Sequence, residues 1–182
     1  MDKLNSKNLI ELVELAKKGN KGAFSELYEN YITPIFRFVY FRVRNRVDTE
    51  DLTQSIFLKA WNALPNYKQK ENPFSSWLYA IARNTVTDFW KKKKDWNIGE
   101  LGENAIKSKE EPIDDLIEKE ENLRELKEVI ELLTDEQQEV IILRFIDGLS
   151  NKEISKIIGK KEDAIRQLQS RAIRILREYL KK

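Results

Sequence analysis

The chain has 182 residues and carries 33 Lys and Arg against 31 Asp and Glu, a formal net charge of +2. It contains no cysteine and no histidine, which excludes thiol and imidazole nucleophiles and removes the usual zinc ligands. No apolar run approaches the roughly 18 residues of a membrane span, and the first residues lack the basic-then-apolar order of a signal peptide. We therefore expect a cytoplasmic, all-α protein of one or two domains, because six glycines and four prolines leave few turn positions.

The charged residues are unevenly distributed. Residues 1–94 hold 17 basic and 10 acidic side chains, residues 95–140 hold 5 and 16, and residues 141–182 hold 11 and 5. Two basic blocks separated by an acidic one indicate two contacts with nucleic acid, joined by a segment that avoids it. Chance clustering of charges is the alternative.

Two helices are predicted at the N-terminal end. Residues 7–18 place their apolar side chains on one face and end at Gly19. The pattern resumes from Lys21 to about Val43, with Pro34 expected to bend the helix. The end of this helix mixes arginines with Phe and Tyr, a combination that holds single-stranded nucleic acid through backbone charge and base stacking. Aromatic residues at helical spacing are more often part of a core, which is the alternative.

A third helix is predicted from Asp48, its expected N-cap, to about Trp61. Its apolar residues would pack inward, which leaves Glu50, Asp51 and Gln54 on the outer side, near the exposed Leu58 edge. On the residues alone, the carboxylates of the first turn need be nothing more than partners of the helix dipole.

A polar loop around Tyr67 leads to a fourth helix, which Asn72 is expected to cap and which carries Pro73 in its first turn. The outer side of this helix shows Arg83 or Asn84, then Thr87 and Asp88, and ends in four lysines, Lys91 to Lys94. Lysines at this position also complement the negative end of a helix, so the sequence leaves their role open.

Periodicity fades from residue 95 to 112, where we expect a flexible, acidic linker. An acidic helix follows to about Leu133. Thr134 and Gln137 then form a capping box that opens the next helix. The core candidates of that helix are Val140, Ile141, Leu143 and Phe145.

Residues 149–179 have the pattern of a helix-turn-helix. Ser150 and Glu153 form a second capping box, Gly159 suits the left-handed position that ends a helix, and a second helix begins near Glu162. One side of the second helix is apolar, and the other carries donors that match guanine and adenine edges in the major groove. That side consists of Arg166, Gln167, Ser170, Arg171, Arg174 and Arg177. An amphipathic hairpin with a merely solvated basic face is the alternative.

In this order the elements resemble the extracytoplasmic-function (ECF) group of bacterial RNA polymerase sigma factors. The motifs that carry the resemblance are EDLTQSIFLKAW, FSSWLYAIARN and LTDEQQEV, followed by the helix-turn-helix. The resemblance implies a sigma region 2 bundle over residues 1–94, the linker over 95–112, and a sigma region 4 domain over 113–182. The larger members of the family have an additional domain at the linker, for which this chain has no room.

The resemblance also implies roles for particular residues. Asp51, Gln54 and Leu58 match positions that dock on the clamp helices of the polymerase β′ subunit. Tyr67 and Asn84 match the pocket that captures a flipped base of the −10 element, and Lys91 and Lys92 would meet phosphates of the upstream duplex. Five residues match positions that meet the −35 element: Arg166, Gln167, Ser170, Arg171 and Arg174.

The expected function is therefore that of a non-enzymatic promoter-specificity subunit, which reads −10 and −35 elements, helps melt the DNA, and binds core polymerase (β′ and β) and promoter DNA. An anti-sigma factor is an expected partner, and neither a cofactor nor a metal is expected. Gln167 stands where Ser is common in the family, and the loop KQKEN also diverges, so base preferences cannot be transferred. A dimeric helix-turn-helix regulator and a metal-dependent RNA-processing enzyme are the alternatives, although the carboxylates lack metal-ligand spacing.

Overall fold

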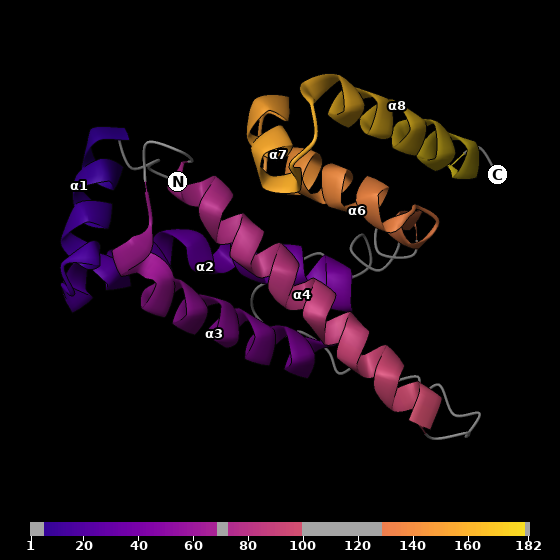
Figure 1. The fold of residues 1–182 in the computed structure, drawn as a ribbon. Helices are drawn as coiled ribbons and strands as arrows, with labels where there is room; N and C mark the ends of the chain where they lie inside the picture. The colour runs from indigo at the N-terminus through magenta and orange to yellow at the C-terminus, as the bar shows by residue number, and fades with distance from the viewer. Residues whose placement is uncertain (1–5, 69–72, 100–128, 181–182) are drawn as a thin grey trace.

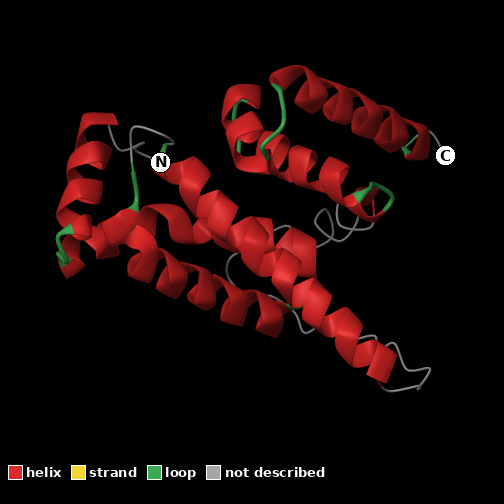
Figure 2. Cartoon of the chain, viewed as in Figure 1, coloured by secondary structure: helices red, strands yellow, loops and turns green. Residues whose placement is uncertain are grey.

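The computed structural model describes residues 6–68, 73–99 and 129–180, and within these ranges the regular structure is helical, as predicted (Figure 2). The N-terminal domain consists of α1 (Ser6–Lys17), α2 (Lys21–Val43), α3 (Arg46–Ala63), the short turn η1 (Leu64–Asn66) and α4 (Phe74–Gly99). The C-terminal domain consists of α6 (Asp135–Ile141), the π-helical turn η2 (Ile142–Ile146), α7 (Asn151–Ile158) and α8 (Glu162–Tyr179). Within the described part of the chain, no helix is both long enough and apolar enough to cross a membrane.

The N-terminal domain is a bundle in which α2 packs against α1, α3 and α4 (Figure 1). The Asn20 side chain accepts a hydrogen bond from the Ala23 amide and so starts α2, which runs without a break through Pro34. Aromatic rings fill the bundle, for example Phe38 of α2 edge-to-face with Tyr79 of α4 at 5.6 Å. The aromatic residues of α2 therefore serve largely as core, which was the alternative reading of that stretch.

The start of α3 differs from the prediction. Asn45, not Asp48, is the N-cap, and its side chain accepts a hydrogen bond from the Asp48 amide at 2.9 Å. Arg44 has a positive φ of 65°, which ends α2 and turns the chain into α3 within two residues. Asp48 lies instead in the first turn, where its carboxylate favours the positive end of the helix.

Helix α4 extends further than the sequence predicted. It continues to Gly99, so residues 95–99 are helical rather than part of the expected linker. The predicted cap Asn72, and residues 100–112 of the expected linker, lie outside the described residues.

The C-terminal domain confirms both capping boxes and the glycine turn. The Thr134–Gln137 and Ser150–Glu153 pairs each exchange two hydrogen bonds, and Gly159 has a φ of 76°. One core candidate was wrong: Phe145 is 57% exposed, whereas Val140, Ile141 and Leu143 are buried as expected. Phe145 lies in η2, where the wider π-helical turn shifts side chains off the period of the preceding α-helix.

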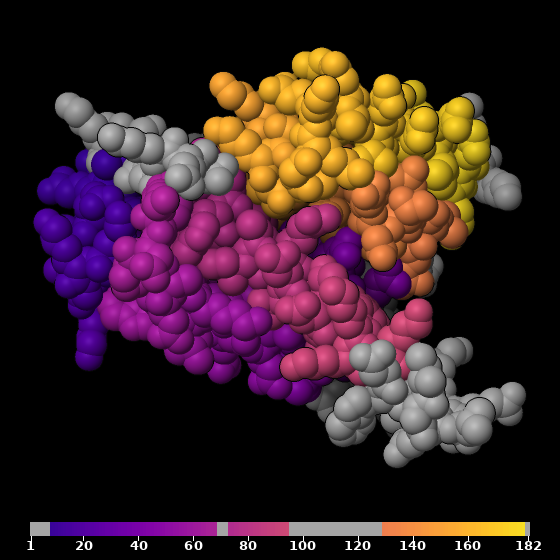
Figure 3. Space-filling model, viewed as in Figure 1, coloured from indigo at the N-terminus to yellow at the C-terminus, as the bar shows by residue number. Residues whose placement is uncertain are grey.

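The two domains pack directly against each other. Helix α4 contacts α7, and α2 contacts η2. Buried residues of both domains, among them Leu78 and Ile154, belong to one continuous hydrophobic cluster. In the space-filling view, the orange and yellow C-terminal domain lies on the magenta and pink face of α4 (Figure 3). We call this packing the closed arrangement.

Candidate nucleic-acid interface

Helix α8 presents a polar, basic face to solvent. Ile165 and Ala172 are buried against the rest of the C-terminal domain, and this fixes the rotation of the helix. All five predicted −35 residues then lie on the outer side and are exposed: Arg166, Gln167, Ser170, Arg171 and Arg174. The turn at Gly159 connects α7 to α8 in the order that a helix-turn-helix requires.

A shallow hollow of about 600 Å³ runs along this face of α8. Arg166, Ser170 and Arg174 line it, together with Gln169 and Arg177, which were not among the predicted −35 contacts. Arg166, Ser170 and Arg174 follow one another at a spacing of four residues, so they lie on one stripe of the helix. Arg177, three residues further on, continues this stripe, so the same spacing rule could have identified it.

The guanidinium of Arg166 already has acidic partners. It lies 2.8 Å from Asp163 Oδ1 and 3.6 Å from Glu162 Oε2, both in the first turn of α8. These pairs are exposed and therefore contribute little stability, so a phosphate or a base edge can replace them.

The predicted polymerase-docking residues lie together on α3. Asp51, Gln54 and Leu58 are exposed at spacings of three and four residues, so they form one stripe of the helix. Leu58 is 62% exposed, and a large aliphatic side chain in this position is available for a partner. The stripe faces away from Ile56 and Ala60, which are fully buried.

The four residues predicted for the −10 element do not share one surface. Asn84, Lys91 and Lys92 are exposed on α4, and Asn84 and Lys91 are two helical turns apart on the same side. Tyr67 is only 4% exposed, and its ring packs against Phe74 and Trp77. Burial raises the pKa of Tyr67 to about 12. The Tyr67 ring is therefore part of the core beside the first turn of α4, and in this arrangement it does not face the solvent.

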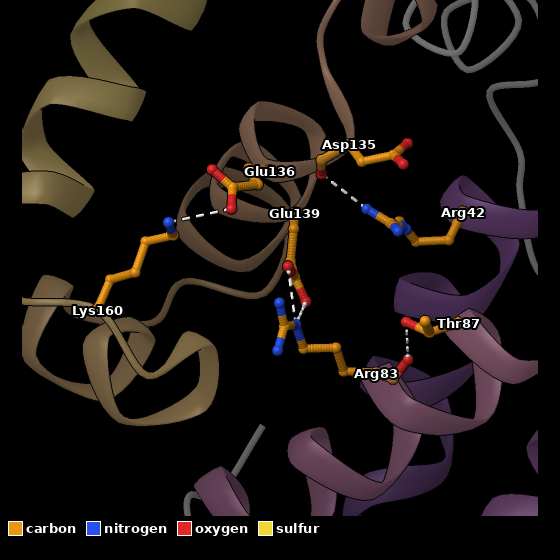
Figure 4. A network of polar contacts seen from close by, with 7 residues as sticks. All are labelled: Arg42, Arg83, Thr87, Asp135, Glu136, Glu139 and Lys160. Atoms are coloured by element: carbon orange, nitrogen blue, oxygen red, sulfur yellow. Dashed lines mark hydrogen bonds and ion pairs between the residues drawn. The ribbon is translucent and has the colours of Figure 1, made fainter.

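Polar contacts connect the two domains through Arg83 of α4 and Arg42 of α2 (Figure 4). Arg83 Nε lies 2.8 Å from Glu139 Oε1 and donates a hydrogen bond of 3.1 Å to Oε2. Arg42 donates to the Asp135 carbonyl at 2.7 Å. The Glu139 side chain is 3% exposed, and this burial raises its pKa, against the opposing influence of Arg83 and Arg42.

A second carboxylate is buried between the domains. Asp147, at the end of η2, has a fully buried side chain, and its ion-pair partner Arg37 of α2 lies at 3.5 Å. Burial raises the pKa of Asp147 to about 6, although the Tyr79 hydroxyl and Arg37 act in the opposite direction. Burial and then the nearby Asp147 carboxylate raise the pKa of Tyr79. The sequence analysis did not identify either acidic residue, because each lies within or next to an apolar run and has the local pattern of a solvated charge.

Two family models match the chain. The model of Sigma-70 region 2 matches residues 27–95, and that of Sigma-70, region 4 matches residues 123–176. The first match runs from within α2 to within α4, and the second includes both capping boxes, α7 and most of α8.

Curated relatives match over most of the chain. The ECF RNA polymerase sigma factor BldN of Streptomyces coelicolor is 36% identical over 179 residues, which cover 97% of this chain and 67% of BldN. The ECF RNA polymerase sigma factor SigX of Bacillus subtilis is 27% identical over 86% of this chain and 83% of its own length.

Solved structures share the fold. CnrH, solved in complex with the cytosolic domain of CnrY, superposes with a TM-score of 0.73 at 22% identity over 93% of this chain and 95% of CnrH. The sigma factor RpoE of Bartonella quintana, solved with the anti-sigma factor NepR, gives a TM-score of 0.70 at 23% identity over 87% of this chain and 96% of RpoE. With a helical bundle, a capped helix-turn-helix and relatives of this identity and coverage, the chain belongs to the ECF family of RNA polymerase sigma factors.

Proposed function

We propose that this chain is a promoter-specificity subunit that binds core RNA polymerase, positions it at −10 and −35 elements and helps to open the DNA. The observation that supports this most directly is the presence of two separate exposed sets, one on α4 and one on α8, in a chain that matches sigma regions 2 and 4. It acts by binding and positioning, in the cytoplasm, where the polymerase and the chromosome are.

At the −35 element, α8 enters the major groove of the duplex. Arg171 and Gln167 contact base edges there, since bidentate Arg–guanine and Gln–adenine pairs are the common means of direct readout. Arg166, Ser170 and Arg174 complete the contact surface, partly through phosphates, which set the register of the protein on the duplex.

At the −10 element, the exposed face of α4 contacts the non-template strand. Extruding one base costs a few kcal/mol, which a pocket of fitting shape and polarity offsets for the correct base only. Asn84 is suited to this, because its amide offers both a donor and an acceptor. Lys91 and Lys92 bind upstream phosphates, and Tyr67 contributes through its packing on Phe74 and Trp77 at the start of α4.

The docking surface for core polymerase is the stripe of Asp51, Gln54 and Leu58 on α3, which binds the β′ clamp helices, with further contacts to the β subunit. An exposed leucine beside polar groups is a common composition for an interface of this kind. An anti-sigma factor is a further partner, as it is for RpoE in the structure with NepR.

Transcription in vitro with purified core enzyme over a random promoter library tests the proposal. Transcripts should depend on both the chain and the core enzyme, and the selected promoters should share two elements at a fixed spacing. Tight binding of the isolated chain to a symmetric operator, without an effect on core polymerase, would instead indicate a dimeric regulator.

A further inference from the structure

The closed arrangement brings acidic groups of the C-terminal domain onto arginines of the N-terminal domain. Arg83 pairs with Glu139 and Arg37 with Asp147, while Arg44 Nη1 lies 2.9 Å from Glu131 Oε1. The first two carboxylates are buried and the third is half exposed. Between two domains, such contacts select one relative orientation, because any other orientation leaves a buried charge without a partner.

The two buried carboxylates are not equally well satisfied. Glu139 has both oxygens within 3.1 Å of Arg83 Nε. Asp147 has no exposed side-chain surface, yet its guanidinium partner is at 3.5 Å and is itself 41% exposed. Removing a carboxylate from water costs several kcal/mol, and a long contact to a hydrated partner offsets this cost only in part. The negative charge of Asp147 therefore opposes the closed arrangement, whereas the apolar contacts between the two domains favour it.

Two groups of the N-terminal domain partly offset the cost of burying Asp147. The Tyr79 hydroxyl of α4 and, to a smaller extent, Arg37 of α2 favour the charged carboxylate, but burial has the larger effect. Arg144, on its own element, instead donates to the Leu149 carbonyl at 2.9 Å. Burial is the largest cause of the raised pKa of Asp147. The charged carboxylate therefore has a higher free energy in the closed arrangement than when the domains are apart.

In the closed arrangement, the two predicted DNA-binding surfaces lie too close together to contact both promoter elements at once. Arg83, the residue before Asn84, forms its ion pair with Glu139 of α6, and α6 packs on α8. Helix α8 is about 27 Å long at 1.5 Å per residue. With packed helices 8–10 Å apart, the predicted contacts on α8 lie within roughly 40 Å of Asn84. Elements centred about 25 base pairs apart are roughly 85 Å apart on B-DNA. The 29 residues 100–128 can span at most roughly 100 Å, so the covalent chain permits separation.

We propose that Asp147 keeps the contact between the two domains reversible: its buried, loosely paired charge weakens the closed arrangement, so that the domains separate and reach both promoter elements. The second clause rests on the proposed function, whereas the first concerns the free chain alone. An ordinary stabilising ion pair makes the opposite prediction for Asp147, because neutralising the carboxylate would then loosen the closed arrangement.

Resonance energy transfer between the domains tests the first clause. Because the chain has no cysteine, Asp88→Cys and Glu178→Cys, both at exposed positions, give two unique dye sites. The midpoint of the loss of transfer is measured in urea, while circular dichroism follows the helices. Asp147→Asn keeps the shape and removes the charge, so we expect a higher midpoint. Arg37→Met removes the partner and keeps the alkyl stem, so we expect a lower one.

The double variant and a matched control complete the experiment. Asp147→Asn in the Arg37→Met background should restore the midpoint, because no uncompensated charge remains. Glu14→Gln, which breaks an ion pair contained within α1, should leave the midpoint unchanged. A lower or unchanged midpoint for Asp147→Asn overturns the proposal, whether the domains separate before they unfold or unfold together.

Transcription tests the second clause separately. With core polymerase, Asp147→Asn should reduce open-complex formation severalfold on a promoter with both elements. If the midpoint rises and open-complex formation is unchanged, the link to promoter binding is wrong while the effect on closure stands. If the parent chain supports no transcription at all, the proposed function fails and the energy-transfer result is unaffected.

Discussion

At the level of single residues, Arg171 is the most direct test of the −35 interface. It is exposed on α8, and among the described residues it forms no ion pair like those of Arg166. Arg171→Ala should weaken binding of the holoenzyme to a −35 duplex by about 1–3 kcal/mol and relax the preference at one base pair. Fluorescence anisotropy on a set of duplexes with single substitutions measures both effects. Lys21→Ala, which removes an equal charge from the start of α2, is the control. If both variants lose the same affinity, Arg171 contributes only its charge and does not read a base.

Asn84 makes a prediction of a different kind, because a base-reading side chain changes preference more than affinity. Asn84→Ala should lower promoter opening on the preferred −10 sequence while leaving substituted sequences nearly unaffected. Permanganate footprinting over a −10 library measures this. Asn62→Ala is a control of the same residue type at another exposed position. A uniform loss over the library would show that Asn84 does not select the base.

At the level of helices, the start of α7 depends on one side chain. Ser150 Oγ accepts a hydrogen bond from the Glu153 amide, and Glu153 Oε2 accepts one from the Ser150 amide at 2.8 Å. Ser150→Ala should lower the free energy of unfolding by roughly 0.5–2 kcal/mol, the usual cost of a lost N-cap. Urea unfolding followed by circular dichroism gives the value. Ser25→Ala, in the exposed interior of α2, should cost little, and a matching loss there would mean that the cap is not the cause.

The docking stripe on α3 belongs to the same level, since its residues act through their shared side of one helix. Leu58→Ala and Asp51→Ala should each reduce affinity for core polymerase by roughly tenfold or more, as expected for a central interface residue. Neither should change the stability of the free chain, because both side chains are exposed. Competition binding to labelled core enzyme measures the affinity. Ile10→Ala, which removes an exposed aliphatic side chain from α1, is the control and should bind core polymerase with unchanged affinity. If all three variants bind with the same affinity, the polymerase docks on another surface.

At the level of the whole molecule, the closed arrangement should depend on pH. The pKa of Asp147 rises from an ordinary 3.8 to about 6 on burial, so the closed chain binds more protons than the open one between these values. The resulting stabilisation is complete below pH 4 and is lost as the pH rises through 6. Asp147 should therefore lower the closed-to-open ratio about fourfold between pH 5.5 and 7.5. The raised pKa of Glu139 adds to this in the same direction.

The energy-transfer pair on α4 and α8 measures this dependence. Asp147→Asn should remove its share of the change and leave a shallower pH profile. A ratio that rises with pH would mean that the ion pair with Arg37 outweighs the burial of the carboxylate, which would contradict the balance inferred from the 3.5 Å contact.

Most of the individual elements could be predicted from the sequence because their causes are local. The capping boxes at Thr134 and Ser150, the turn at Gly159 and the rotation of α8 depend on hydrogen bonds and periodicity within a few residues. The predictions were wrong where the local sequence allowed a second structure, either another N-cap or another helical period. Asn45 replaced Asp48 as the cap, and η2 moved Phe145 off the α-helical period.

The sequence by itself determined the helices, their polar and apolar faces and the family, and with them the surfaces that would contact DNA and polymerase. Only the tertiary structure decided that the two domains share one hydrophobic cluster, that the Tyr67 ring is buried against Phe74 and Trp77, and that Asp147 is buried against Arg37. The physical reason is one of range. A cap or a helical face is determined by neighbours along the chain. The burial of a carboxylate depends instead on the fit between surfaces that lie far apart in the sequence, and no local pattern predicts that fit.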